Sequence, residues 1–222
     1  MENAMEIMKA RHSVRRYTDR PIPQETRAAL DAACARLNAE GGLNMQIVYD
    51  EPECFGGRRA HYGHFENCRN YIAVVGRKAR DLDERAGYYG EMLVLEAQAL
   101  GLNTCWAALT HGKSKAVINK GETEVIVISL GYGKYPGRER PSKAPEEVSN
   151  VTPDAPEWFK NGVAAALLAP TAVNQQKFRL ERSGGTVKAA AAKLGPCLKI
   201  DLGIVKRHFE LGAGKETFTW EE

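Results

Sequence analysis

The sequence predicts an α+β fold in which an antiparallel or mixed sheet is flanked by helices. Three short runs rich in β-branched and aromatic residues are typical of strands, and they lie at Met45–Tyr49, Tyr71–Val75 and Val125–Leu130. Segments with apolar residues at helical spacing separate and follow these runs. We therefore predict two unequal halves, residues 1–150 and 151–222, with an extended connection at the end of the first half.

Two helices are predicted in the first half. Apolar residues at positions i, i+3, i+4 and i+7 indicate an amphipathic helix that ends at the Gly41–Gly42 pair. These residues are Leu30, Ala33, Cys34 and Leu37. A second, buried helix is expected over Glu84–Leu100, with Gly101 as its C-terminal stop. Its predicted apolar stripe consists of Tyr88, Met92, Leu95 and Ala99.

The second half begins after Tyr135–Pro156, a stretch rich in proline and charge that predicts an extended connection. Asp154 as N-cap and Pro156 in the first turn then predict a helix that stops at Pro170. Its expected apolar residues are Phe159, Val163, Ala166 and Leu167.

A strand at Phe178–Glu181 and two more helices are expected to follow that helix. The last helix is predicted to start at Asp201 as N-cap and to end at Gly212. Its apolar stripe would consist of Leu202, Val205 and Phe209.

Composition describes a globular chain of 222 residues with 43% hydrophobic and 27% charged residues. The five cysteines form an odd set without a C-x-x-C pair, which argues against a disulfide framework and a zinc ribbon. A zinc site at Cys54, His61, His64 and Cys68 is the metal alternative. Because that spacing is not a standard zinc pattern and the segment is rich in glycine, we expect a mobile loop and no metal.

Features of membrane or secreted proteins are absent from the sequence. No uncharged apolar run approaches the roughly 18 residues that a membrane span requires. The N-terminus carries acidic residues where a signal peptide would be basic. We therefore expect a cytoplasmic protein without a membrane partner. The net charge of +3 is too small to indicate nucleic-acid binding by itself.

The densest positive cluster is Arg11-His12-Ser13-Val14-Arg15-Arg16, here called the arginine segment. In an extended chain, alternate side chains share a face, so Arg11, Ser13 and Arg15 would point the same way. Arginine forks and a hydroxyl suit a phosphate group. The alternative interpretation is a solvated basic arm.

A second polar stretch is Ala169-Pro170-Thr171-Ala172-Val173-Asn174-Gln175-Gln176, here called the Asn–Gln segment. Its side-chain amides carry both a donor and an acceptor, and they could therefore bind the edge of a pyrimidine-like ring. A plain polar turn between a helix and a strand is the alternative.

Two further stretches have weaker signals. Gly101–Trp106 is expected to be a loop of small residues that could bring backbone N–H groups to a flat ligand, or Trp106 could simply fill the core. Gly131-Tyr132-Gly133 follows the best strand, but the prolines after it forbid the helix that a dinucleotide fingerprint must open. There is also no G-x-S-x-G motif and no cysteine with a motif partner histidine.

Taken together, R-x-S-x-R, the L-G-L-N-T-C-W stretch, the G-Y-G turn and A-P-T-A-V-N-Q-Q resemble the FMN-dependent nitroreductase family over most of the chain. The resemblance implies that Arg11, Ser13 and Arg15 bind the FMN phosphate, assisted by Arg140 or Lys143, and that His12 also belongs to the cofactor site. It also implies that Pro170, Thr171, Ala172, Asn174 and Gln176 line the flavin. A backbone N–H from Trp106, Ala107, Ala108 or Leu109 would lie near flavin N5.

The order of motifs differs from the usual family pattern. The family's P-S-x-x-N-x-Q motif normally follows the arginine motif closely and serves the partner subunit, whereas here Leu37–Gln46 lacks the proline and the motif lies near residue 170. The chain resembles a branch in which one chain folds like a whole dimer, with two pseudo-symmetric halves. This implies one FMN site within one chain, assembled from both halves, and a monomer would hold one FMN.

The implied activity is transfer of hydride from NADH or NADPH, through flavin N5, to a nitroaromatic compound, a quinone or a similar acceptor. No protein acid or base is required, so no catalytic side chain is named. Two alternatives stay open. One is a flavin-binding or sequestering protein without reductase activity, and the other is a nucleic-acid-binding protein that uses the arginine segment as a basic arm.

Overall fold

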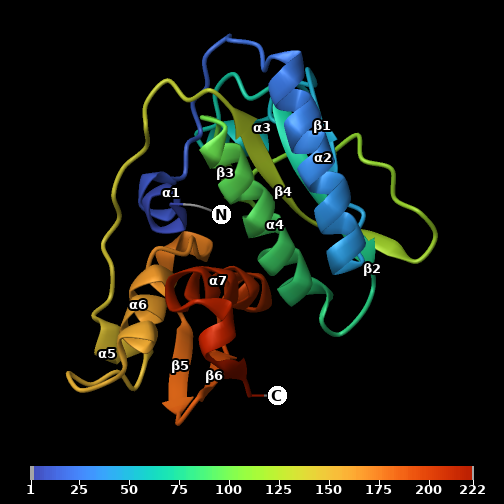
Figure 1. Ribbon diagram of the computed structural model, residues 1–222. Coiled ribbons are helices and arrows are strands. Elements are labelled where there is room, and N and C mark those ends of the chain that lie inside the picture. The colour runs from blue at the N-terminus through green and yellow to red at the C-terminus, as the bar shows by residue number, and fades with distance from the viewer. Residues whose placement is uncertain (1–2, 222) are drawn as a thin grey trace. The chain divides into compact units, whose positions relative to one another are not determined.

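The computed structural model describes residues 3–221, and the chain divides into two compact units (Figure 1). Unit 2 contains Ala10–Leu82 and Met92–Glu139. Unit 1 contains the N-terminal segment through Lys9, Asp83–Glu91 and the chain from Arg140 onward. Each unit is therefore built from segments that lie far apart in the sequence. Among the described residues, no helix has the length and apolar character needed to cross a membrane.

Unit 2 is organised around a four-stranded sheet in the order β1-β2-β4-β3, in which every neighbouring pair is antiparallel. Its strands are β1 (Gln46–Val48), β2 (Asn70–Arg77), β3 (Asn103–Ala107) and β4 (Glu122–Gly131). All three predicted strands of the first half are confirmed. β2 is buried on both faces except at its last residue, because helices cover one side and loops cover the other.

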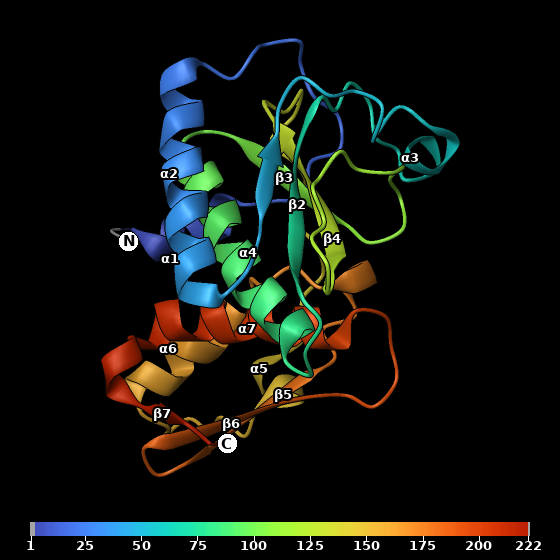
Figure 2. The ribbon, with the colours of Figure 1, turned by 90° about the vertical axis from the view of Figure 1, so that its right-hand side faces the viewer.

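Helix α2 (Gln24–Gly41) runs along the sheet of unit 2 (Figure 2). The prediction for this helix is confirmed: Leu30, Cys34 and Leu37 are buried, and Gly42 ends the helix with φ of 59°. Helix α4 (Leu82–Ala99) confirms the second prediction, although its buried stripe is shifted. Ala99 is exposed, whereas Leu93 and Val94 are fully buried.

The other face of the unit 2 sheet is covered by loops and by the short helix α3 (Arg58–Tyr62). Their side chains form an apolar cluster with the alternate residues Tyr71, Ala73 and Val75 of β2. Three buried cysteines belong to this cluster, and they are Cys54, Cys68 and Cys105. Burial raises the pKa of each of these thiols, so they are unreactive core residues.

Unit 1 contains the helices α5 (Pro145–Val148), α6 (Glu157–Ala166) and α7 (Leu198–Ala213) together with the N-terminal half of α4. Short α1 (Ala4–Ala10) begins in this unit. The predicted helix starts need correction. Pro156 itself occupies the N-cap of α6 in an extended conformation, and Asp154 lies before the helix. α7 begins three residues before Asp201, with Cys197 as N-cap.

The second sheet has the order β5-β6-β7, with strands at Phe178–Ser183, Thr186–Ala191 and Thr219–Trp220. β5 and β6 form an antiparallel hairpin across Gly184–Gly185, while β6 and β7 are parallel. The strand at β5 is confirmed. The expectation of two further helices is wrong, because the alanine-rich segment forms β6. In the described chain α7 is followed by the short 3-10 turn η2 (Lys215–Thr217) and then by β7.

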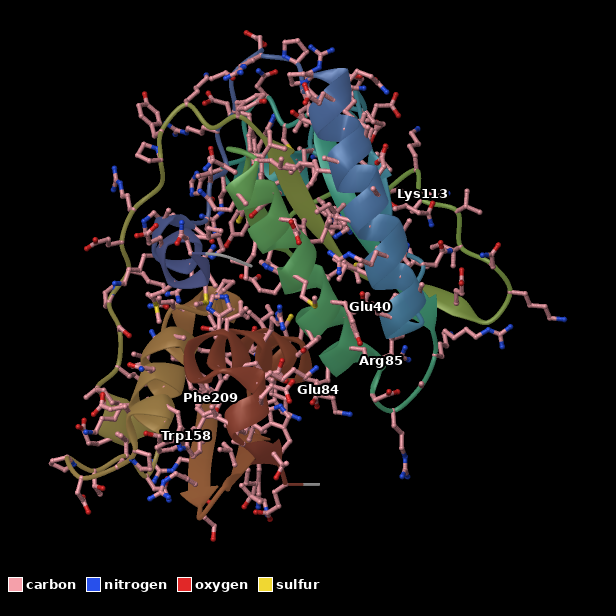
Figure 3. All side chains as sticks on the ribbon, viewed as in Figure 1. Glu40, Glu84, Arg85, Lys113, Trp158 and Phe209 are labelled. Atoms are coloured by element: carbon pink, nitrogen blue, oxygen red, sulfur yellow. The ribbon has the colours of Figure 1, made fainter. Side chains whose placement is uncertain are left out.

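Helices α4 and α7 approach so closely within unit 1 that glycine is required. A Cβ atom on Gly87 would lie 2.0 Å from the carbonyl oxygen of Ile200, and one on Gly203 would lie 2.0 Å from that of Glu84. An aromatic cluster fills the space between α6 and α7, where the Trp158 and Phe209 rings meet edge to face with centroids 6.5 Å apart (Figure 3).

Candidate functional site

The arginine segment is fixed to the edge of the unit 2 sheet. The Val14 N–H donates to the Thr104 carbonyl oxygen on β3 at 3.0 Å. The Tyr17 hydroxyl lies 2.6 Å from both the Val14 carbonyl oxygen and the Ser129 hydroxyl. Val14 and Tyr17 are buried. The segment is therefore part of the folded sheet, which excludes the solvated arm.

Arg11, Ser13 and Arg15 gather around one buried thiol, that of Cys105. Burial raises the pKa of this thiol. Three groups oppose the rise, and they are the charge of Arg15, a hydrogen bond with Ser13 and the charge of Arg11. Arg11 is 3% exposed, whereas Ser13 and Arg15 are exposed. The structure thus brings the three predicted phosphate ligands together, with two of them facing solvent.

Arg15 and its neighbour Arg16 differ in how they are engaged. Within residues 3–221, Arg15 forms no ion pair and no side-chain hydrogen bond, although its charge acts on Tyr17 and Cys105. Arg16 is 3.6 Å from Glu66 in an exposed ion pair. The Arg15 guanidinium therefore keeps its donors available for an anion.

The G-Y-G turn packs against the arginine segment. The Gly133 N–H donates to the Asn103 Oδ1 atom at 2.9 Å, and a Cβ on this glycine would lie 2.8 Å from Val14. A Cβ on Gly137 would lie 2.4 Å from the Cβ of half-buried His12. No helix begins until Pro145, which confirms that this turn is not a dinucleotide fingerprint.

The stretch that contains Trp106 is strand β3, so the expected loop is wrong. Trp106 is half-buried and Ala107 is buried, while Ala108 and Leu109 are exposed beyond the strand. Backbone groups alternate in direction along a strand, so the Trp106 N–H and C=O point to the same outer edge as the Thr104 C=O. This is the edge that the arginine segment joins.

The Asn–Gln segment lies in unit 1 and has an unusual backbone. After buried Pro170 and half-buried Thr171, the 3-10 turn η1 (Ala172–Asn174) begins. Val173, Asn174 and Gln176 all have positive φ, at 47°, 55° and 44°. A β-branched residue rarely adopts this conformation, and Val173 is 88% exposed, so no burial of its side chain compensates the strain.

Gln176 is the anchor of this segment, and its amide is fully used. Its Oε1 atom accepts from the Lys143 N–H at 2.9 Å and from the Ser142 hydroxyl at 3.4 Å. Its Nε2 atom donates to the Pro141 carbonyl oxygen and to Asn174 Oδ1, each at 3.0 Å. An amide has two acceptor positions and two donors, so Gln176 has none to spare.

Arg140 and Lys143 also hold the backbone of unit 1. One Arg140 Nη atom donates to the carbonyl oxygens of Leu167 and Ala169, at 3.2 and 2.6 Å, just beyond the end of α6. The Lys143 ammonium donates to the Gln176 carbonyl oxygen at 3.0 Å. These two residues therefore lie with the Asn–Gln segment in unit 1, whereas the arginine segment belongs to unit 2. Their expected role at the phosphate stays a prediction.

Sequence reasoning missed the part that Asp201 plays. Instead of capping α7, this carboxylate accepts from the Ala172 N–H, with the two oxygens at 3.0 and 3.1 Å. Gln175 Nε2 donates to it at 2.7 Å. Burial raises its pKa to about 6, although the hydrogen bonds from Gln175 and Ala172 lower it. The signal available in the sequence was a lone acidic residue within the apolar stretch Ile200–Ile204.

A hollow of about 250 Å³ opens in unit 2 between the ends of β2 and β4. Tyr132 and Asn70 line it, and no predicted site residue does. In the part of the chain that the structure describes, no group of three or more His, Cys, Asp or Glu side chains could hold a metal ion.

Similarity to known proteins identifies the family of this chain. Residues 3–213 match the profile of a family described as "Putative TM nitroreductase". The chain belongs to this nitroreductase family. No match was found among curated proteins.

Solved structures share this fold. A "putative nitroreductase" from Thermotoga maritima is 22% identical, with a TM-score of 0.67 over 96% of this chain and 85% of that chain. A "putative nitroreductase in complex with FMN" from Desulfovibrio desulfuricans is 17% identical, with a TM-score of 0.56 over 70% of this chain and 99% of that chain. At these identities the nitroreductase-like α+β fold is what the likeness establishes.

Proposed function

We propose that this nitroreductase-family protein is an FMN-dependent oxidoreductase that uses NADH or NADPH to reduce nitroaromatics, quinones or similar acceptors. The observation that carries the proposal is the pair Ser13 and Arg15, exposed beside Arg11 on a fixed segment, with the Arg15 guanidinium uncommitted. This donor set fits a phosphate monoester, which is the charged end of FMN.

The arginine segment would bind the phosphate. Arg15 supplies a planar fork that can contact two phosphate oxygens, and Ser13 adds a hydroxyl donor. Arg11 contributes positive charge from a buried position, where water screens it little. Because hydrogen bonds from Val14 and Tyr17 fix the backbone, little conformational entropy is lost when the phosphate binds.

The Asn–Gln segment would line the flavin mainly through its backbone and through Asn174. The Asn174 side-chain amide donates one hydrogen bond to the Pro141 carbonyl oxygen and accepts one from Gln176. One N–H donor and one acceptor position of this amide are therefore available to a ligand. Gln176 shapes the turn instead of reading the ring. When bound, FMN supplies the redox chemistry by accepting hydride at N5 and passing it to the acceptor.

The test is flavin content together with turnover. We expect the purified protein to be yellow, to release FMN on denaturation, and to oxidise NADH or NADPH in the presence of a quinone. Bound FMN without such oxidation would favour the sequestering protein over the enzyme. A colourless protein whose apo form does not bind added FMN would contradict the proposal altogether.

Stoichiometry tests the single-chain arrangement. The chain has one arginine segment and one Asn–Gln segment, so we propose one FMN per chain and no requirement for a second chain. Analytical ultracentrifugation with flavin quantitation should find one FMN per monomer at every protein concentration. Loss of flavin on dilution to monomers would show a site shared between chains.

Trp106 supplies an optical readout of the same proposal. We expect FMN to quench its fluorescence, because its backbone lies on the β3 edge that the arginine segment joins. Trp158 and Trp220 also emit, so the comparison is with Trp106→Phe. An equal quench in both proteins would place the flavin away from Trp106.

A further inference from the structure

Asp201 is a buried carboxylate that directly supports the strained turn of the Asn–Gln segment. Its oxygens accept from the Ala172 N–H at the start of η1 and from Gln175 Nε2. The same Gln175 nitrogen donates to the Pro196 carbonyl oxygen at 2.7 Å, while its Oε1 atom is buried without a hydrogen-bond partner in the described chain. The turn is thus tied to the first turn of α7 through one acidic side chain.

Within residues 3–221, Asp201 is 6% exposed and forms no ion pair. The Cys197 thiol at the N-cap of α7 interacts electrostatically with Asp201, and Asp83 on α4 acts on that thiol. Both would be neutral or negative, so neither stabilises an ionised Asp201 by charge.

We propose that Asp201 is the positioning residue of the Asn–Gln segment and that its protonation state controls how firmly the strained turn is held. The turn stores backbone strain at Val173, Asn174 and Gln176. Asp201 adds a charge that is costly to bury when it is ionised. Opening the turn relieves both costs.

The direction of the pH effect follows from linkage. In the closed turn the Asp201 pKa is about 6, above the ordinary value of 3.8, because burial penalises the charged form. An open turn exposes the carboxyl to water and returns its pKa toward 3.8. Protonation therefore favours the closed turn, and opening increases as pH rises from about 3.8 and levels off above 6. Since each pKa unit corresponds to a factor of ten, the opening equilibrium changes by at most about 100-fold.

Hydrogen exchange of the flavin-free protein tests this proposal. We expect the protection factors of the Ala172 and Gln176 amides, corrected for intrinsic exchange, to fall about tenfold between pH 5 and pH 8, with the opening constant at half of its plateau near pH 6. Asp201→Asn should remove this pH dependence, and the control Asp83→Asn should keep it. The same profile in wild type and Asp201→Asn would overturn the proposal.

A second variant keeps the test decisive if Asp201→Asn does not fold. The Gln175 hydrogen bond lowers the Asp201 pKa, so Gln175→Met should move the midpoint to higher pH. An unchanged midpoint in that variant would also contradict the proposal.

The consequence for flavin binding rests on the proposed function and is measured separately. Riboflavin is the probe, because it lacks the phosphate whose own titration would obscure the effect. Its affinity should weaken as pH rises from about 4 to 6 and level off above pH 6 in wild type, but stay constant in Asp201→Asn. If exchange shows the switch and no flavin binds, the proposed function fails while the role of Asp201 stands.

Discussion

The arginine segment and the Asn–Gln segment are both rich in side-chain hydrogen-bonding groups, but these groups have different partners in the two segments. In unit 2, Arg15 keeps its guanidinium uncommitted and Ser13 is exposed, because backbone bonds and buried neighbours hold the segment in place. In unit 1, all donor and acceptor positions of the Gln176 side-chain amide form hydrogen bonds within the protein. A polar motif can therefore serve a ligand in two ways. Its side chains can contact the ligand directly, or they can fix the shape of a backbone segment that contacts the ligand.

Gln176→Ala should have the largest effect, and it should be an effect on stability. The change removes the four hydrogen bonds of the Gln176 side chain, each worth about 0.5–1.5 kcal/mol, and leaves the Lys143 N–H without its acceptor. The Pro141 carbonyl oxygen keeps its bond from Asn174. We expect the free energy of unfolding to fall by about 2–4 kcal/mol in urea denaturation. Asn174→Ala, which removes fewer bonds, should lose less. A loss of unfolding free energy below about 1 kcal/mol for Gln176→Ala would contradict the structural role assigned to Gln176.

Arg15→Ala should show the opposite behaviour. We expect FMN binding to weaken by about 1.5–3 kcal/mol, the range for hydrogen bonds to charged groups. The free energy of unfolding should change by less than about 0.5 kcal/mol, because the side chain is exposed and uncommitted. Titration of the apo-protein with FMN and with riboflavin measures the first effect.

Arg16→Ala is the matched control for that experiment. Arg16 is adjacent in sequence and exposed, but it is paired with Glu66. Its removal should leave FMN affinity nearly unchanged. Equal losses for Arg15→Ala and Arg16→Ala, or equal losses for FMN and riboflavin, would refute the assignment of Arg15 to the phosphate.

Local patterns predicted most of the fold. Runs of β-branched and aromatic residues indicated the strands of the first half, and period-3.6 apolar spacing indicated helix α2. The failures depend on pairing with another strand, which local spacing does not reveal. The alanine-rich segment 186–191 has high helix propensity, but pairing with β5 across Gly184–Gly185 makes it a strand. Trp106 lies in a strand because β4 pairs with it.

The sequence predicted part of the candidate site, as it predicted part of the fold. Alternate spacing in the arginine segment indicated that Arg11, Ser13 and Arg15 converge, and the structure brings them to one thiol. Spacing could not indicate that Gln176 is saturated or that Asp201 supports Ala172, because both depend on tertiary contacts between segments about thirty residues apart. An aspartate near a helix start is more often a cap, which is why Asp201 was assigned that role.

Val173→Asn should have a smaller effect than Gln176→Ala or Arg15→Ala, and it should stabilise the protein. Val173 is 88% exposed with φ of 47°, so its side chain loses no packing when replaced, while asparagine tolerates this conformation better than a β-branched residue. We expect the free energy of unfolding to rise by about 1 kcal/mol. Val173→Thr is the control, since threonine is also β-branched and keeps the strain. Equal stabilities of the two variants would show that the turn of unit 1 carries no strain at this position.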